Sequence, residues 1–139
     1  MKKNKRFSGI LVRCNDKVLL CKRSNDNTLP GQWSIPGGGI EDGETPEDAA
    51  RREFYEETNI KINGKLNLVG FVDRYNKDGT YLKGFMYVYG LDVDDEIYPD
   101  LDNASDGGEH SECGYFGVDE LPITNKSDEF YKIVVKSLQ

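Results

Sequence analysis

The sequence predicts an α+β fold in which helices pack around a mixed β-sheet. Segments rich in apolar and β-branched residues fall into two groups, one before residue 24 and one after residue 65. A well-capped helix separates the two groups, and an amphipathic helix ends the chain. Because sheets and helices bury their apolar faces against each other, this order favours one sheet covered by helices.

The first strands form a predicted hairpin. Residues 7–14 and 17–23 are apolar enough to be strands, and Asn15-Asp16 between them is typical of a tight turn. Residues 24–36 are predicted as a loop, and Pro36 followed by three glycines marks a sharp break in regular structure.

The central helix has clear start and stop signals. Thr45 is a good N-cap, Pro46 suits the first helical position, and Asp48 stands at the capping-box position. We expect the helix to end near Thr58-Asn59, since asparagine tolerates a left-handed C-cap. The remaining predicted elements are strands at 66–75 and 81–91 joined by a turn at 76–79, an acidic loop at 92–112, a short strand at 114–118, and a helix at 128–138.

Length and charge narrow the functional classes. The 139 residues fit one domain over residues 1–139, with no apolar run long enough to span a membrane and no signal-like start. Eighteen basic and 25 acidic residues give a net charge of −7, which disfavours binding to nucleic acid. An anionic substrate would therefore need a bound divalent cation.

The cysteines and the histidine set two further limits. Cys14, Cys21 and Cys113 form no CxxC pair, so we expect reduced, buried thiols and a cytoplasmic protein. His110 is the only histidine, which excludes any site that needs two.

Three glutamates of the central helix form a candidate metal site. Glu53, Glu56 and Glu57 are spaced i, i+3 and i+4, which places them on one helix face. Like charges at this spacing destabilise an isolated helix by about 0.2–0.5 kcal/mol per pair. A solvated acidic face is the plain interpretation, whereas Mg²⁺ is held by such carboxylates together with substrate phosphates.

The surroundings of these glutamates favour a metal site. The glycine run allows backbone to approach a ligand closely, and Glu44 precedes the helix, where the helix dipole favours a carboxylate. From Gly38 the sequence reads glycine, five residues, Glu44, seven residues, then REFYEETNI over 52–60. This 23-residue pattern resembles the Nudix box, Gly-x5-Glu-x7-Arg-Glu-apolar-x-Glu-Glu-x-Gly-apolar, with Asn59 in place of its second glycine.

Looser similarity to the Nudix family extends over most of the chain. It covers the strand at 19–23, the segment 29–36 and the segment 116–122. The resemblance implies a Nudix-type α/β/α sandwich with a mixed sheet. It also implies a hydrolase that cleaves a nucleoside diphosphate linked to another group, using Mg²⁺ or Mn²⁺ to offset phosphate charge and lower the pKa of bound water.

The resemblance assigns roles to the residues of the box. Glu53, Glu56 and Glu57 are implied to bind metal, assisted by the carbonyl of Gly38. The general base would be Glu53 or a carboxylate from a later loop. In that later loop Glu109 is favoured, so we expect Glu53, Glu57 and Glu109 to be the catalytic residues.

Other residues have weaker functional signals. By the resemblance, Glu44 and Arg52 orient the metal ligands. Lys22 and Arg23 end a strand and could contact phosphate, with strand-end solvation as the alternative. Trp33 could stack on a base.

Glu112 is the second acidic candidate in the later loop, and solvated loop acids are the alternative for both it and Glu109. A lone loop histidine such as His110 has no functional role in most proteins.

Several substrates remain open at this stage. We expect a (deoxy)nucleoside triphosphate, normal or oxidised, to be cleaved to its monophosphate and pyrophosphate. A dinucleoside polyphosphate or an ADP-sugar is the alternative within the family, and removal of an RNA cap is disfavoured because the sequence offers no basic surface for RNA. A non-catalytic nucleotide-sensing module is the alternative of another class, but such modules usually lose glutamates that this chain retains. We expect a monomer or weak homodimer.

Overall fold

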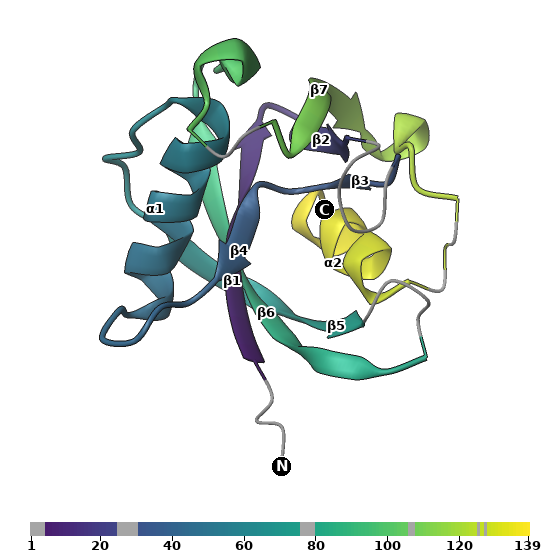
Figure 1. Cartoon of the computed structure of the whole chain (residues 1–139). Helices are drawn as coiled ribbons and strands as arrows, with labels where there is room; N and C mark the ends of the chain where they lie inside the picture. The colour runs from purple at the N-terminus through teal and green to yellow at the C-terminus, as the bar shows by residue number, and fades with distance from the viewer. Residues whose placement is uncertain (1–4, 25–30, 76–79, 106–107, 125, 127) are drawn as a thin grey trace.

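The computed structural model describes residues 5–24, 31–75, 80–105, 108–124, 126 and 128–139. A seven-stranded mixed sheet lies between two helices, with strand order β3-β2-β1-β6-β5, β4 on β1 and β7 on β2 (Figure 1). The strands are β1 (Lys5–Cys14), β2 (Lys17–Arg23), β3 (Trp33–Ser34), β4 (Gly37–Gly39), β5 (Asn67–Tyr75), β6 (Leu82–Val93) and β7 (His110–Gly117). The helices are α1 (Pro46–Thr58) and α2 (Glu129–Ser137), with 3-10 turns at Leu101–Asn103 and Val118–Glu120.

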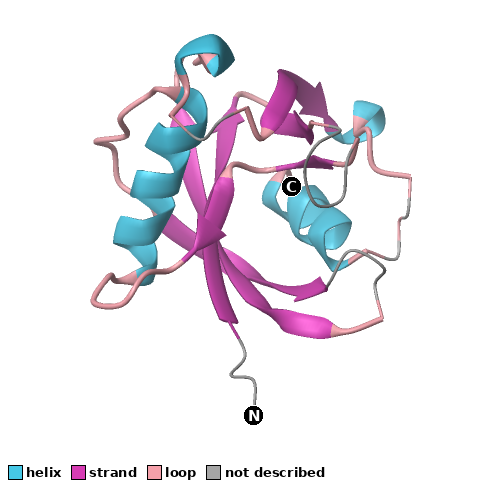
Figure 2. Cartoon of the chain, in the orientation of Figure 1, coloured by secondary structure: helices cyan, strands magenta, loops and turns pink. Residues whose placement is uncertain are grey.

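Strand β1 is the centre of the sheet. It runs parallel to β6 from the pair Lys5↔Gly84 to the pair Cys14↔Val93, and antiparallel to β2 and β4. Residues 8–12 of β1 are all buried, which explains why Ile10, Leu11 and Val12 are consecutive apolar residues without alternation. The α+β class with a mixed sheet is therefore confirmed, and the two helices lie on opposite sides of the sheet (Figure 2).

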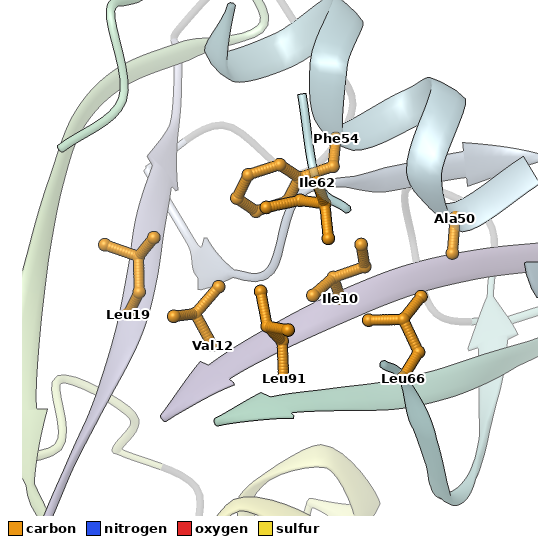
Figure 3. Packing of buried hydrophobic residues seen from close by; sticks show 8 residues of the cluster. All are labelled: Ile10, Val12, Leu19, Ala50, Phe54, Ile62, Leu66 and Leu91. Atoms are coloured by element: carbon orange, nitrogen blue, oxygen red, sulfur yellow. The ribbon is translucent and has the colours of Figure 1, made fainter. Parts of the chain in front are cut away.

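Helix α1 packs on one face of the sheet through Ala50 and Phe54. Their side chains meet Ile10 and Val12 of β1 and Leu91 of β6 (Figure 3). Both helix residues are completely buried, so α1 is fixed against the sheet by apolar contact. On the other face α2 contributes Val134 to a second core with Leu11, Val18, Leu20, Ile35, Val72, Met86 and Val88.

The predicted ends of α1 are confirmed. The Thr45 hydroxyl accepts a hydrogen bond from the Asp48 amide at 3.1 Å. At the other end Asn59 adopts a left-handed conformation with φ 60° and donates its N–H to the Tyr55 carbonyl. The asparagine that departs from the Nudix pattern therefore still terminates the helix.

Three short elements differ from the sequence prediction. The predicted loop at 24–36 contains β3, the predicted break at 36–39 contains β4, and β7 begins at His110 rather than at residue 114. Strands of two or three residues, such as β3 and β4, are too short to show an alternation of apolar and polar residues. Glycine suits β4 because a Cβ on Gly37 would lie 2.6 Å from the Ser8 carbonyl oxygen. The predicted turn at 76–79 lies outside the described residues.

The predicted state of the cysteines is wrong for two of the three. Cys21 and Cys113 form a disulfide between directly opposite positions of β2 and β7, and Cys14 is a buried free thiol. The pairing of the two strands brings together residues that are 92 positions apart, which no local pattern indicates. A cytoplasmic location stays a prediction. No helix in the described part of the chain has the length and apolar character needed to cross a membrane.

A thiol count tests this pairing. Protein denatured without reductant should take up one equivalent of iodoacetamide, at Cys14, and three equivalents after reduction. Mass spectrometry of the alkylated chain gives both numbers. Three equivalents without reductant, in protein purified under air, would contradict the disulfide.

Candidate functional site

The site is built where the face of α1 meets β4. The Glu53 carboxylate lies against Gly38, and a Cβ on Gly38 would lie 2.5 Å from the Glu53 carboxyl carbon. A side chain at position 38 would therefore require this carboxylate to move. Burial raises the pKa of Glu53, while the hydrogen bond from Arg52 acts in the opposite direction.

Arg52 joins the acidic residues of the site into one network. Its Nε donates to Glu44 Oε2 at 2.7 Å, and its Nη1 donates to Glu53 Oε1 and to Glu56 Oε2, each at 3.0 Å. Its Nη2 donates to Glu44 Oε1 and to the Gly39 carbonyl, each at 2.9 Å. This hydrogen bonding lowers the pKa of Glu44. The orienting role of Arg52 and Glu44 toward a metal stays a prediction.

Glu57 is the most buried acid of the site, with a side chain 0% exposed. His110 Nδ1 lies 3.6 Å from Glu57 Oε1, and the His110 side chain is 1% exposed. His110 stands opposite Arg23 at the start of β7. Sequence reasoning treated His110 as an ordinary loop residue, because nothing local shows that β7 begins there and faces α1.

The two acidic candidates of the later loop occupy different environments. The Glu109 carboxylate lies within electrostatic range of Glu53 and contributes to the raised pKa of Glu53. The Glu109 carbonyl accepts a hydrogen bond from the Ser24 amide at 2.9 Å, which ties the loop to the end of β2. Glu112 is exposed and stands opposite Lys22 in the β2–β7 pair. Glu109 is therefore the acid that the structure brings toward the glutamates of α1.

The proposed substrate contacts lie around the end of β2. Lys22 and Arg23 are half-buried and end this strand, and Lys22 also pairs with Trp33 of β3. The Trp33 ring packs edge-to-face on Phe116, with ring centres 5.2 Å apart. Trp33 thus belongs partly to the second core, and its contact with a base stays a prediction.

The donor set fits a hard divalent cation. Glu53, Glu56, Glu57 and the Gly38 carbonyl offer only oxygen ligands, as Mg²⁺ prefers. Arg52 bonds to one oxygen of Glu53 and one of Glu56, so the second oxygen of each lies outside these contacts. Within the described ranges, no three acidic, histidine or cysteine side chains converge closely enough to hold an ion as they stand.

The acidic face of α1 lies against the glycine strand β4, next to a mixed sheet. This arrangement can be compared with known protein families. The sequence model of the NUDIX domain matches residues 2–135. The chain belongs to the NUDIX domain family, as the resemblance of its box indicated.

Solved structures of this class share the fold. A MutT NUDIX hydrolase from Burkholderia pseudomallei superposes with a TM-score of 0.78 and 22% identity, over 99% of this chain and 100% of that one. The NUDIX domain of Shewanella oneidensis NrtR, solved with ADP ribose, gives a TM-score of 0.72 and 18% identity, over 100% and 91%.

Curated relatives match over shorter stretches. Nucleoside triphosphatase NudI from Enterobacter sp. (strain 638) is 50% identical over 53 residues, which cover 37% of this chain and 38% of the relative. Diphosphoinositol polyphosphate phosphohydrolase 2 from Rattus norvegicus is 39% identical over 106 residues, 76% of this chain and 52% of the relative. The chain thus spans less than two thirds of the length of either relative.

Proposed function

We propose that the chain is a divalent-metal-dependent pyrophosphohydrolase acting on a nucleoside diphosphate linked to another group. A (deoxy)nucleoside triphosphate, normal or oxidised, is the substrate we favour, with a nucleoside monophosphate and pyrophosphate as products. The observation that carries the proposal is the Glu53 carboxylate seated on Gly38 and held by Arg52, next to the buried Glu57. The match to NudI, a nucleoside triphosphatase by name, supports the substrate class.

The roles of the residues follow from their positions. Glu53, Glu56 and Glu57 with the Gly38 carbonyl would hold Mg²⁺ or Mn²⁺. When bound, such an ion offsets phosphate charge and lowers the pKa of a coordinated water. Arg52 orients Glu53 and Glu56, and Glu44 in turn orients Arg52.

Proton transfer and phosphate binding fall to the residues around this carboxylate face. A carboxylate oxygen of Glu53 or Glu109 accepts the proton of the attacking water. Arg23 and Lys22, at the end of β2, contact the phosphates. Proton acceptance by Glu53 or Glu109 and phosphate binding by Arg23 and Lys22 both require the nucleotide to lie next to α1.

The substrate is identified by a turnover panel in Mg²⁺. It includes normal and oxidised nucleoside triphosphates, ADP-ribose, NADH and dinucleoside polyphosphates, with products identified by chromatography. A diphosphoinositol polyphosphate belongs in the panel because the relative of that name matches over 76% of the chain. Release of a nucleoside monophosphate from one substrate class supports the proposal. No turnover of any member would instead favour a nucleotide-sensing module.

Removal of the metal should abolish this turnover. Dialysis against EDTA is expected to lower the rate to background, because a protein of net charge −7 otherwise repels a polyphosphate. Adding Mg²⁺ or Mn²⁺ should restore the rate, whereas adding Na⁺ at equal ionic strength should not. Full activity in EDTA would contradict metal dependence.

A further inference from the structure

Arg74, at the end of β5, points toward the buried side of the sheet. Val72 is buried and Asp73 exposed, so the alternation along β5 places Arg74 on the face of Val72. The Arg74 guanidinium carbon lies 5.0 Å from the centre of the Phe7 ring, and Nη1 lies 3.9 Å from the Met86 sulfur. Apolar and soft groups therefore hold this cation against the second core.

Arg74 lacks an acidic partner in the described part of the chain. There, no carboxylate oxygen is within 4.0 Å of its guanidinium, whereas Arg52 binds Glu44 at 2.7 Å and Arg13 binds Asp92 at 2.7 Å. Burial lowers the pKa of Arg74, as expected for a cation that has lost water. Partly buried arginines are normally paired with an anion, so an anion from outside the protein is a candidate ligand for Arg74.

The charges around Arg74 belong to the candidate site. Arg74 Nη1 lies 3.9 Å from the Met86 sulfur, and Met86 also lies against Gly37, the neighbour of Gly38 in β4, where a Cβ would lie 3.1 Å from Met86 Cε. Glu57 of α1 and Glu109, which precedes β7, act electrostatically on the guanidinium. It is also within range of Arg23, the last residue of β2, and the two guanidinium groups repel each other. An anion bound by both Arg74 and Arg23 would relieve this repulsion.

We propose that Arg74 binds a phosphate of the substrate, together with Arg23, and so determines specificity for a chain of at least two phosphates. The guanidinium fork can hold two oxygens of one phosphate, which a single ammonium group cannot do. One phosphate would then lie at the glutamates of α1 and a further phosphate at the two arginines. This inference rests on the proposed function and adds to it a residue that sequence reasoning did not single out.

The test uses imidodiphosphate, a pyrophosphate analogue with a non-hydrolysable bridge, and isothermal titration calorimetry in saturating Mg²⁺. The R74M variant keeps the packing on Phe7 and Met86 but removes the charge, and R74K keeps the charge without the fork. R74M should bind imidodiphosphate at least about tenfold more weakly, with R74K in between. The control R6M removes an exposed arginine whose contact is the Tyr87 hydroxyl, and should bind within about twofold of wild type.

A second measurement separates phosphate binding from a structural role. Mn²⁺ affinity without the anion, measured by electron paramagnetic resonance, should be the same in R74M and wild type. For the substrate found in the turnover panel, R74M should raise KM about tenfold or more with little change in kcat. Loss of Mn²⁺ binding together with imidodiphosphate binding in both R74M and R74K would show a structural role and overturn the inference.

The outcome for Arg74 is separable from that for the proposed function. Wild-type affinity for imidodiphosphate in R74M would overturn the inference even if the protein hydrolyses nucleotides. Weak binding by R74M alone would support it even if no member of the panel is turned over. Absence of imidodiphosphate binding by the wild-type protein would overturn it as well.

Discussion

Glu57→Gln should lower kcat by about 10³-fold while the protein still folds. Loss of a charged metal ligand removes about 4 kcal/mol of transition-state stabilisation, which corresponds to this factor. The substitution changes the side-chain volume very little, and the Glu57 side chain is 0% exposed, so packing around it is kept. Steady-state kinetics in Mg²⁺ and a circular dichroism spectrum give the two readouts.

The matched control for this variant is Glu47→Gln. Glu47 lies on the same helix, but its side chain is 45% exposed and contacts Arg51 at 3.5 Å. It should retain wild-type kcat, since it lies outside the acidic face at Gly38. If the Glu57→Gln and Glu47→Gln variants had similar kcat values, Glu57 would not be a metal ligand.

Arg52→Lys should reduce both activity and stability. Arg52 donates to Glu44, Glu53, Glu56 and the Gly39 carbonyl, and a lysine has neither the reach nor the planar fork to keep all of them. We expect kcat to fall about 10- to 100-fold, as for groups that orient metal ligands. The free energy of unfolding should fall by about 1–2 kcal/mol, a value reduced because the Arg52 side chain is 24% exposed. Urea denaturation measures this loss.

Arg51→Lys provides the comparison for this variant. Arg51 is the neighbouring residue and makes one hydrogen bond to the Ile62 carbonyl at 3.0 Å besides its contact with Glu47. Its substitution should leave kcat unchanged. Equal effects of the two lysine variants would mean that Arg52 has no orienting role.

The parts of the fold that local chemistry specifies were predictable. Helix α1 has its N-cap Thr45, its first-turn proline and its left-handed Asn59 in the sequence, and each acts as expected. The hairpin of β1 and β2 was also predictable, since a turn signal separates two apolar segments. Strands β3 and β4 were not predictable, because pairing with β2 and β1 stabilises them and their own residues do not.

The candidate site also has parts that were predictable from the sequence and parts that were not. Glu44, Arg52 and Glu53 come from one continuous segment, and the helical period alone brings Glu53, Glu56 and Glu57 to one face. The burial of His110 against Glu57 depends instead on where β7 joins β2.

The same dependence on strand pairing applies to two other features. It brings Cys21 opposite Cys113, and it carries Arg74 of β5 toward the residues of α1 and β2. Such long-range pairings have no signature in a single sequence.

The central claim is that the acidic face of α1 binds the catalytic cation. A crystal of the protein soaked in Mn²⁺, with anomalous diffraction recorded near the manganese absorption edge, tests it most directly. We predict an anomalous peak bounded by Glu53, Glu56, Glu57 and the Gly38 carbonyl, at the distances of about 2.0–2.2 Å that are typical of small divalent cations. A peak bound elsewhere, or none at this face at saturating Mn²⁺, would contradict the assignment of the site.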